Sequence, residues 1–158
     1  MNRIAEIAEI AESLIDATVR DEGVLSVLTR LKKGEIEEVV ADFAESFCFN
    51  DRGLGLEFTD KDRLREFFQK EREFYPGSTF RTKKALAVED YAVAEWLLEY
   101  SINEPFYGNA LRNVLVSLHG VTVIRTRKGK IIEWSDYYDG LISRRTALTS
   151  YFTDWNEL

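Results

Sequence analysis

The sequence predicts an α+β domain in which helices cover one face of a curved antiparallel sheet. Helical periodicity occupies the first third of the chain, one more helical pattern follows residue 58, and strand patterns dominate from residue 79 onward. The strongest signal is residues 114–139, where two strand patterns flank a turn. Gly129 lies in that turn and can adopt the positive φ that a tight hairpin needs.

The composition is that of one acidic globular domain. The 158 residues carry a net charge of −7 and are 45% hydrophobic, which is enough for a sizeable core. Nucleic acids and anionic membranes require basic patches, so neither is an expected partner. The only cysteine, Cys48, allows no intrachain disulfide and favours a cytoplasmic protein. One histidine and one cysteine do not build a usual zinc site, so no metal is expected.

Four helical segments are predicted before residue 76. Residues 2–21 carry a stripe of Ile and Ala, and residues 24–31 form a second helix that ends at Lys32-Lys33-Gly34. The others cover residues 35 to about 46 and about 59–74. The expected domain boundaries are an N-terminal helical extension (1–22), an α+β domain (23–152) and a tail (153–158).

The remaining elements are strands and one closing helix. A short strand at 47–51 precedes an irregular segment at 52–58. The long strands are expected at 79–88, 92–102, 114–125 and 131–138, and the closing helix at about 141–152.

Asp136 is the residue on which the functional argument depends. Alternation in the last strand places it on the same face as Ile132, Trp134 and Tyr138. Ionising a carboxyl group among aromatic side chains is costly. Two interpretations are open: Asp136 accepts hydrogen bonds that hold the fold together, or it exchanges protons in a pocket with a raised pKa.

Other polar residues allow similar alternatives. Glu71 interrupts the apolar stripe of its helix, so it either extends to water from the edge of the stripe or faces a pocket. His119 alternates with Leu118, so it faces outward if Leu118 faces the pocket. An apolar outward row on this strand then indicates a dimer contact. Its members are Leu115, Ser117, His119, Val121 and Val123.

Several motifs resemble the nuclear-transport-factor-two-like superfamily. They are the Gly-Glu-Ile-Glu segment at 34–37, the strand ending in Phe49-Asn50-Asp51, and residues 120–139 with the run Glu133-Trp134-Ser135-Asp136. The last is similar to SnoaL-like polyketide cyclases, limonene epoxide hydrolases and ketosteroid isomerases. The resemblance implies a cone-shaped, cystatin-like α+β barrel with a deep hydrophobic pocket, often dimeric through the outer face of the sheet.

The resemblance also implies roles for individual residues. Asp136 matches the aspartate that acts as general acid or base, and Trp134 and Tyr138 match pocket-lining positions. An epoxide hydrolase would carry an arginine and an aspartate where this chain has Trp96 and Leu98, so epoxide hydrolysis is not expected. Such a hydrolase also positions its water molecule with a tyrosine and an asparagine, and this chain has Phe49 and Asp51 at the matching positions. Asp51, Asp136, Tyr100 and Tyr138 could supply the base and oxyanion hole of an isomerase, although no motif fixes them.

Two functional hypotheses follow. The first is an enzyme without cofactor, a cyclase, isomerase or lyase, that acts on a small hydrophobic carbonyl compound with Asp136 and Asp51 as catalytic residues. The second is a module that binds a small molecule without chemistry or serves dimeric assembly. The expected binding residues are Phe49, Phe67, Glu71, Tyr75, Trp96, Leu98, Tyr100, Val116, Leu118, Trp134 and Tyr138.

Overall fold

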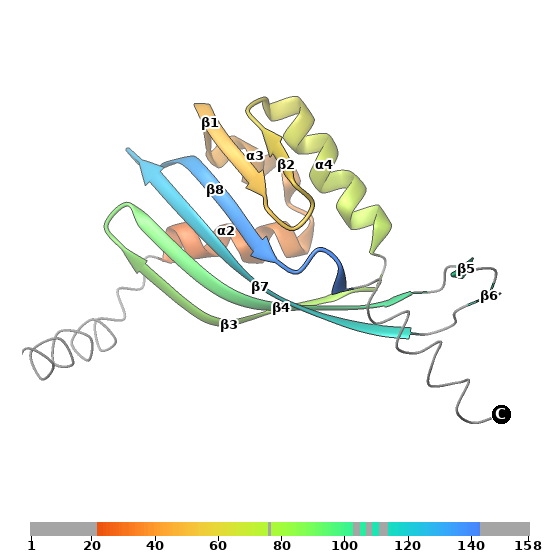
Figure 1. Ribbon diagram of the computed structural model, residues 1–158. Helices are drawn as coiled ribbons and strands as arrows, with labels where there is room; N and C mark the ends of the chain where they lie inside the picture. The colour runs from red at the N-terminus through yellow and green to blue at the C-terminus, as the bar shows by residue number, and fades with distance from the viewer. Residues whose placement is uncertain (1–21, 76, 103–104, 107–108, 111–113, 143–158) are drawn as a thin grey trace, which may run out of the picture.

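Three helices lie on one side of a curved sheet in the computed structural model, which describes residues 22–75, 77–102, 105–106, 109–110 and 114–142 (Figure 1). The helices are α2 (Glu22–Lys33), α3 (Ile36–Asp42) and α4 (Lys61–Phe74). Helix α2 packs against β3 (Thr79–Val88) and β4 (Tyr91–Ile102) at one edge of the sheet. Helix α3 packs against β1 (Phe43–Asp51), and α4 packs against α3 and against β2 (Leu56–Phe58) at the other edge. The predicted helix at 2–21, nearly all of the one at 141–152 and the tail lie outside the described residues.

The main sheet has six strands in the order β2-β1-β8-β7-β4-β3. Their bounds are Phe43–Asp51 (β1), Leu56–Phe58 (β2), Thr79–Val88 (β3), Tyr91–Ile102 (β4), Val114–Arg127 (β7) and Lys130–Tyr138 (β8). The short strands β5 (Pro105–Phe106) and β6 (Asn109–Ala110) pair separately. The predicted α+β class and curved sheet are confirmed, with two corrections. The sheet is mixed, because β1 pairs with β8 in parallel, and within the described residues it is open rather than closed into a barrel.

The ends of the helices follow from local sequence. Gly34 has φ 83° and closes α2, with its N–H donating to the Leu31 carbonyl and the Glu35 N–H donating to the Arg30 carbonyl, both at 3.0 Å. Asp60 caps α4 by accepting from the Arg63 N–H at 2.9 Å. These local bonds set where α2 ends and where α4 begins.

Helix α3 is shorter than the sequence indicates, and β1 begins earlier. The helical stripe that starts at Ile36 fits Phe43 as its last member, but the chain turns extended there and the helix ends at Asp42. Phe43, Phe47 and Phe49 are all buried along β1. The irregular segment at 52–58 likewise contains β2, which pairs with the end of β1.

The β7–β8 hairpin forms as predicted but contains a bulge. Lys128 and Gly129 have φ of 51° and 73°, as a two-residue turn requires. Arg125 pairs with Glu133 and Thr126 with Ile131, so Ile132 is the extra residue. The bulge reverses the predicted faces before it: Ile131, not Ile132, packs in the core with Trp134.

The inner and outer faces of β7 alternate as predicted. Val116, Leu118, Gly120 and Thr122 are buried, whereas Leu115, Ser117 and His119 are exposed.

Within the described residues, no helix has the length and apolar character needed to cross a membrane.

Candidate functional site

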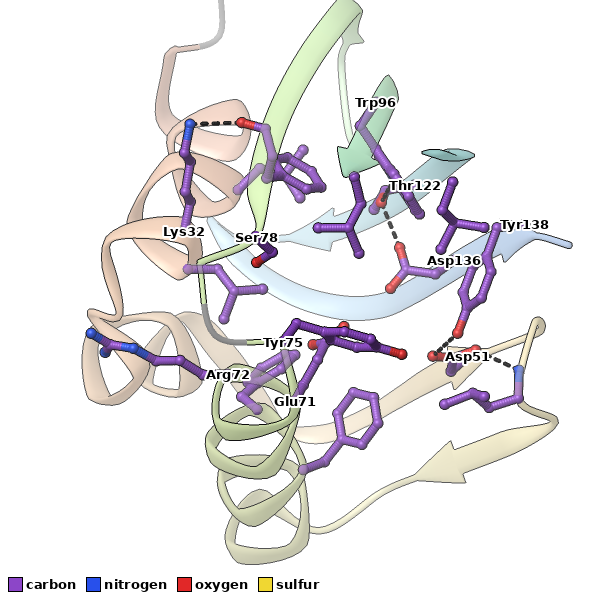
Figure 2. Close-up of a pocket in the computed structure, with 18 of the residues that line it drawn as sticks. Lys32, Asp51, Glu71, Arg72, Tyr75, Ser78, Trp96, Thr122, Asp136 and Tyr138 are labelled. Carbon is purple, nitrogen blue, oxygen red and sulfur yellow. Dashed lines mark hydrogen bonds between the residues drawn. The ribbon is translucent and has the colours of Figure 1, made fainter. Parts of the chain in front are cut away.

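A cavity of about 450 Å³ lies between the helices and the inner face of the sheet (Figure 2). This volume is within the range of small-molecule sites, about 300–1,000 Å³. Its walls are mainly apolar and aromatic, with a few acidic and basic side chains. The lining residues are Leu28, Leu31, Lys32, Ile36, Asp51, Leu54, Phe67, Phe68, Lys70, Glu71, Arg72, Tyr75, Ser78, Phe80, Trp96, Leu98, Leu118, Thr122, Trp134, Asp136 and Tyr138.

Asp136 is held in the cavity wall by two neutral donors. The Thr122 hydroxyl donates to its Oδ1 at 2.5 Å, and the Trp134 Nε1–H donates to its Oδ2 at 2.9 Å. The Trp96 Nε1–H in turn donates to the Thr122 oxygen at 2.8 Å. Thr122 reaches Asp136 because the two residues pair directly across the β7–β8 hairpin.

Gly120 makes this arrangement sterically feasible. It pairs with Trp96 across β4 and β7, and the indole ring lies over it. A Cβ added at Gly120 would lie 2.2 Å from the Trp96 ring. The missing side chain lets the indole lie flat along the sheet, where its N–H reaches Thr122 two residues further along β7.

Asp51 is the second carboxyl group of the cavity. It is buried at the end of β1 and accepts from the Tyr138 hydroxyl and from the Leu54 N–H, both at 2.8 Å. Asp51 pairs with Asp136 in the parallel β1–β8 ladder, which brings the two residues side by side. The Tyr138 ring lies over Gly53, where an added Cβ would approach it to 2.3 Å.

Glu71 is the third carboxyl group, and it differs from the other two. Its side chain projects from α4 into the cavity, and the carboxyl oxygens make no hydrogen bond or ion pair with any described residue. The helix stripe that Glu71 interrupts therefore faces the cavity at this position, as one of the two interpretations of the sequence expected.

Burial changes the protonation of these groups. It raises the pKa of Asp136 to about 7, although the hydrogen bonds from Thr122 and Trp134 act in the opposite direction. Burial also raises the pKa of Glu71 to about 7, and the nearby charges of Asp136 and Asp51 add to the effect. The pKa values of the Tyr75 and Tyr138 hydroxyls are likewise raised, mainly by burial, so both stay protonated at neutral pH.

The structure brings most of the predicted site residues together at this cavity. Those that line it are Asp51, Phe67, Glu71, Tyr75, Trp96, Leu98, Leu118, Trp134, Asp136 and Tyr138. The other three predicted residues pack in the hydrophobic core and do not line the cavity. Phe49 packs in the core against Phe68 and Trp134, whereas Tyr100 and Val116 belong to the second core cluster with Trp96.

Sequence reasoning did not single out Thr122, Ser78, Lys32 or Arg72 as cavity residues. Thr122 could have been found from the alternation of β7, which places it on the same face as Leu118. The positions of Lys32 and Arg72 depend on how α2 and α4 pack, for which the sequence carries no comparable signal. Within the described residues no group of three or more His, Cys, Asp or Glu side chains could hold a metal ion.

Comparison with known proteins agrees with this architecture. The model of the SnoaL-like domain family matches residues 24–134, whereas no curated protein matches the chain significantly. Among solved structures, a candidate SnoaL-like polyketide cyclase from Shewanella putrefaciens superposes with a TM-score of 0.68 at 10% identity, covering 88% of this chain and 92% of its own.

Two further structures show the same fold. IdmH from Streptomyces antibioticus, a candidate polyketide cyclase, has a TM-score of 0.66 at 14% identity and covers 80% of this chain and 96% of its own. A protein with a ketosteroid isomerase-like fold from Catenulispora acidiphila, in complex with trimethylamine, has a TM-score of 0.62 at 17% identity and covers 75% of this chain and 85% of its own. Since the family model spans more than half of the sequence, the protein belongs to the SnoaL-like domain family.

Proposed function

We propose that the protein is a cofactor-independent enzyme of the cyclase, isomerase or lyase type, acting on a small hydrophobic carbonyl compound with Asp136 as general acid and base. One observation carries the proposal: an aspartate whose pKa is raised to about 7 lines an apolar and aromatic cavity. Proton transfer is most efficient when the pKa of the group lies near the working pH.

The proposed first step is removal of a proton from the carbon next to the substrate carbonyl. Ionised Asp136 takes that proton, and the electron pair of the C–H bond moves into the carbonyl to form an enolate. Thr122 and Trp134 hold the carboxyl group in one orientation, so its free lone pairs point in a fixed direction. In an isomerase, Asp136 then returns the proton to another carbon. In a cyclase, the enolate carbon bonds to a second carbonyl carbon, and the new alkoxide takes up the proton.

Glu71 is the proposed donor to the developing enolate oxygen. Its carboxyl group has no partner among the described residues, and a pKa of about 7 leaves it partly protonated at neutral pH. Repulsion between two nearby carboxylates favours the state in which one is ionised and the other carries a proton. That state provides a base and an acid in one cavity. Asp51 is already bonded to the Tyr138 hydroxyl and the Leu54 N–H, so we assign it the role of holding Tyr138 in place.

The alternative is a module that binds a hydrophobic ligand without chemistry. It is favoured by the two donors on Asp136, one on each oxygen, which is the environment of a structural acceptor. The Catenulispora acidiphila protein is described in complex with trimethylamine, and a small-molecule ligand is compatible with either function.

Hydrogen exchange on a simple ketone tests the proposal without knowledge of the natural substrate. The probe is 2-tetralone in D₂O, with loss of its α-proton signals followed by NMR. The wild type should accelerate exchange with a rate that rises as pH passes about 7, and Asp136→Asn should lower the enzymatic rate by about 10²–10⁴-fold.

Binding is measured in parallel by the change in melting temperature. If 2-tetralone and related ketones bind to the wild type but exchange no faster than in buffer, the binding module becomes the better account. Glu57→Gln, a change at an exposed position of β2, is the matched control and should leave exchange unchanged.

We also propose a cytoplasmic homodimer that forms through the outer face of the sheet. The exposed side chains of Leu115, Tyr91 and Val93 on β7 and β4 support this assembly. The free thiol of Cys48 supports a reducing location.

A further inference from the structure

A chain of hydrogen bonds runs across three neighbouring strands and ends at Asp136 (Figure 2). The Trp96 indole on β4 donates to the Thr122 hydroxyl on β7 at 2.8 Å, and that hydroxyl donates to Oδ1 of Asp136 on β8 at 2.5 Å. Trp96 and Thr122 are both buried. The indole N–H of Trp96 reaches Thr122 and not Asp136, so an effect of this bond on the carboxyl group passes through the hydroxyl.

The chemistry of the indole fixes the direction of these bonds. An indole N–H can donate but cannot accept, so the Thr122 oxygen is the acceptor in its contact with Trp96. The Thr122 proton therefore does not point toward Trp96, and the acceptor that the structure shows for it is Oδ1 of Asp136. In the ionised state of Asp136, the hydroxyl is consequently the donor and the carboxylate the acceptor.

A hydroxyl that accepts one hydrogen bond becomes a stronger donor in the next. Each bond in such a chain polarises its neighbour, and the effect is larger in a buried site than in water. The bond to Asp136 is charge-assisted when the carboxyl group is ionised, so it gains most in that state. A hydroxyl oxygen has two lone pairs, so Thr122 can still accept from a protonated Asp136, but without the same gain. The Trp96 bond therefore favours the ionised form of Asp136.

We propose that Trp96 is a positioning residue for proton transfer: its indole N–H orients and polarises the Thr122 hydroxyl, which in turn holds Oδ1 of Asp136 in the proton-accepting state. Trp134 differs, because it donates directly to Oδ2 of the same carboxyl group. The inference deepens the proposed function and rests on it only for the use of Asp136 as the base.

The other ionisable groups around Asp136 are kept constant when Trp96 or Thr122 is changed. The acidic and phenolic ones are Asp51 on β1, Glu71 on α4, Tyr75 at the end of α4 and Tyr138 on β8. The basic ones that line the cavity lie on the helices and are Lys32, Lys70 and Arg72. Among the described residues, β3, β4 and β7 contribute no ionisable side chain to the lining. Glu71 needs a control, because its pKa is also raised to about 7 and it interacts with Asp136.

A double-mutant cycle measures how Trp96 acts on Asp136 through Thr122. The pKa of Asp136 is followed by NMR of the ¹³C-labelled carboxyl groups in the Glu71→Gln background, alone and with Trp96→Phe, Thr122→Val or both. Thr122→Val keeps the shape of the side chain and should raise the pKa by about 1–2 pH units, through loss of a charge-assisted hydrogen bond. Trp96→Phe should raise it by about half a pH unit. Once Thr122→Val is present, Trp96→Phe should have no further effect.

The cycle separates the hydrogen bond from packing. If Trp96 only excludes water from Asp136, its replacement lowers the pKa, or shifts it equally with and without the Thr122 hydroxyl, and either result overturns the inference. An unchanged pKa in Trp96→Phe or in Thr122→Val overturns it as well. Should Trp96→Phe fail to fold, as judged by circular dichroism, the same comparison uses 3-benzothienylalanine at position 96, which has sulfur in place of the indole N–H and keeps the two fused rings.

Exchange of 2-tetralone provides the catalytic readout with Glu71 intact. The midpoint of the pH–rate profile should move up by about half a pH unit in Trp96→Phe, whereas a loss of packing alone would lower the rate at every pH without moving the midpoint. An unmoved midpoint overturns the inference. A wild type that does not accelerate exchange would refute the proposed function, and the NMR cycle would still decide the role of Trp96, so the two failures are distinguishable.

Discussion

Replacing Asp136 by asparagine removes the ionisable group while keeping its shape. The side-chain oxygen of the introduced asparagine can accept from the Trp134 indole, and its amide can donate to the Thr122 hydroxyl, which rotates to accept. The variant thus resembles the protonated aspartic acid. We expect its free energy of unfolding to equal or exceed that of the wild type at neutral pH.

The pH dependence gives this expectation its sign. The carboxyl ionises near 3.8 in the unfolded chain, and burial raises its pKa to about 7 in the folded protein. Between these values the folded state holds a proton that the unfolded state has lost, so wild-type stability falls as pH rises from about 4 to about 7. The full difference corresponds to about 4 kcal/mol, of which about 2–3 kcal/mol develops between pH 5 and pH 8. Asp136→Asn has no ionisable group at this position, so its free energy of unfolding should not show this fall with pH.

Urea unfolding followed by circular dichroism measures the effect. The free-energy difference between Asp136→Asn and wild type should grow in favour of the variant by about 2–3 kcal/mol from pH 5 to pH 8. Glu57→Gln, at an exposed position of β2, should show no such trend. The reasoning is refuted if Asp136→Asn costs several kcal/mol at pH 8, because Asp136 would then be an ionised structural acceptor.

Three further predictions concern the sheet and the chain ends. Gly120→Ala should lower the free energy of unfolding by about 1–3 kcal/mol, because the new methyl group displaces the Trp96 ring from its hydrogen bond with Thr122. An unchanged midpoint of urea unfolding would show that the ring can move at no cost. Light scattering at micromolar concentration should give twice the chain mass of 18.3 kDa, and Leu115→Lys, at a residue 58% exposed on the outer face, should shift it toward the monomer; a monomeric wild type would argue against the dimer. Deleting residues 1–20 should lower the melting temperature by several degrees through lost apolar burial, whereas an unchanged value would mean that this segment contributes no packing.

Much of the fold could be predicted from local patterns. The end of α2 at Gly34 and the turn at Lys128-Gly129 depend on residues close in sequence, and both form as expected. The start of α4, predicted at about residue 59, lies next to its cap, Asp60. The boundary between α3 and β1 could not be placed in this way. Phe43 fits the helical period from Ile36 and also the period of the strand that follows, and its contacts with Phe47 and Trp134 decide between them.

The site was predictable where it depends on alternation and not where it depends on long-range pairing. Trp134, Asp136 and Tyr138 line the cavity because the strand period holds after the bulge at Ile132. The parallel pairing that sets Asp51 beside Asp136 joins segments far apart in the chain, and no local signal specifies it.

The titration of Asp136 itself tests the central claim most directly. NMR of the ¹³C-labelled side-chain carboxyl groups, assigned by comparison with Asp136→Asn, follows its ionisation across the pH range. A raised folded-state pKa predicts a chemical-shift transition for Asp136 centred at about 7. A transition near the ordinary value of 3.8, or below it, would contradict the account and leave Asp136 as a structural acceptor in a binding module.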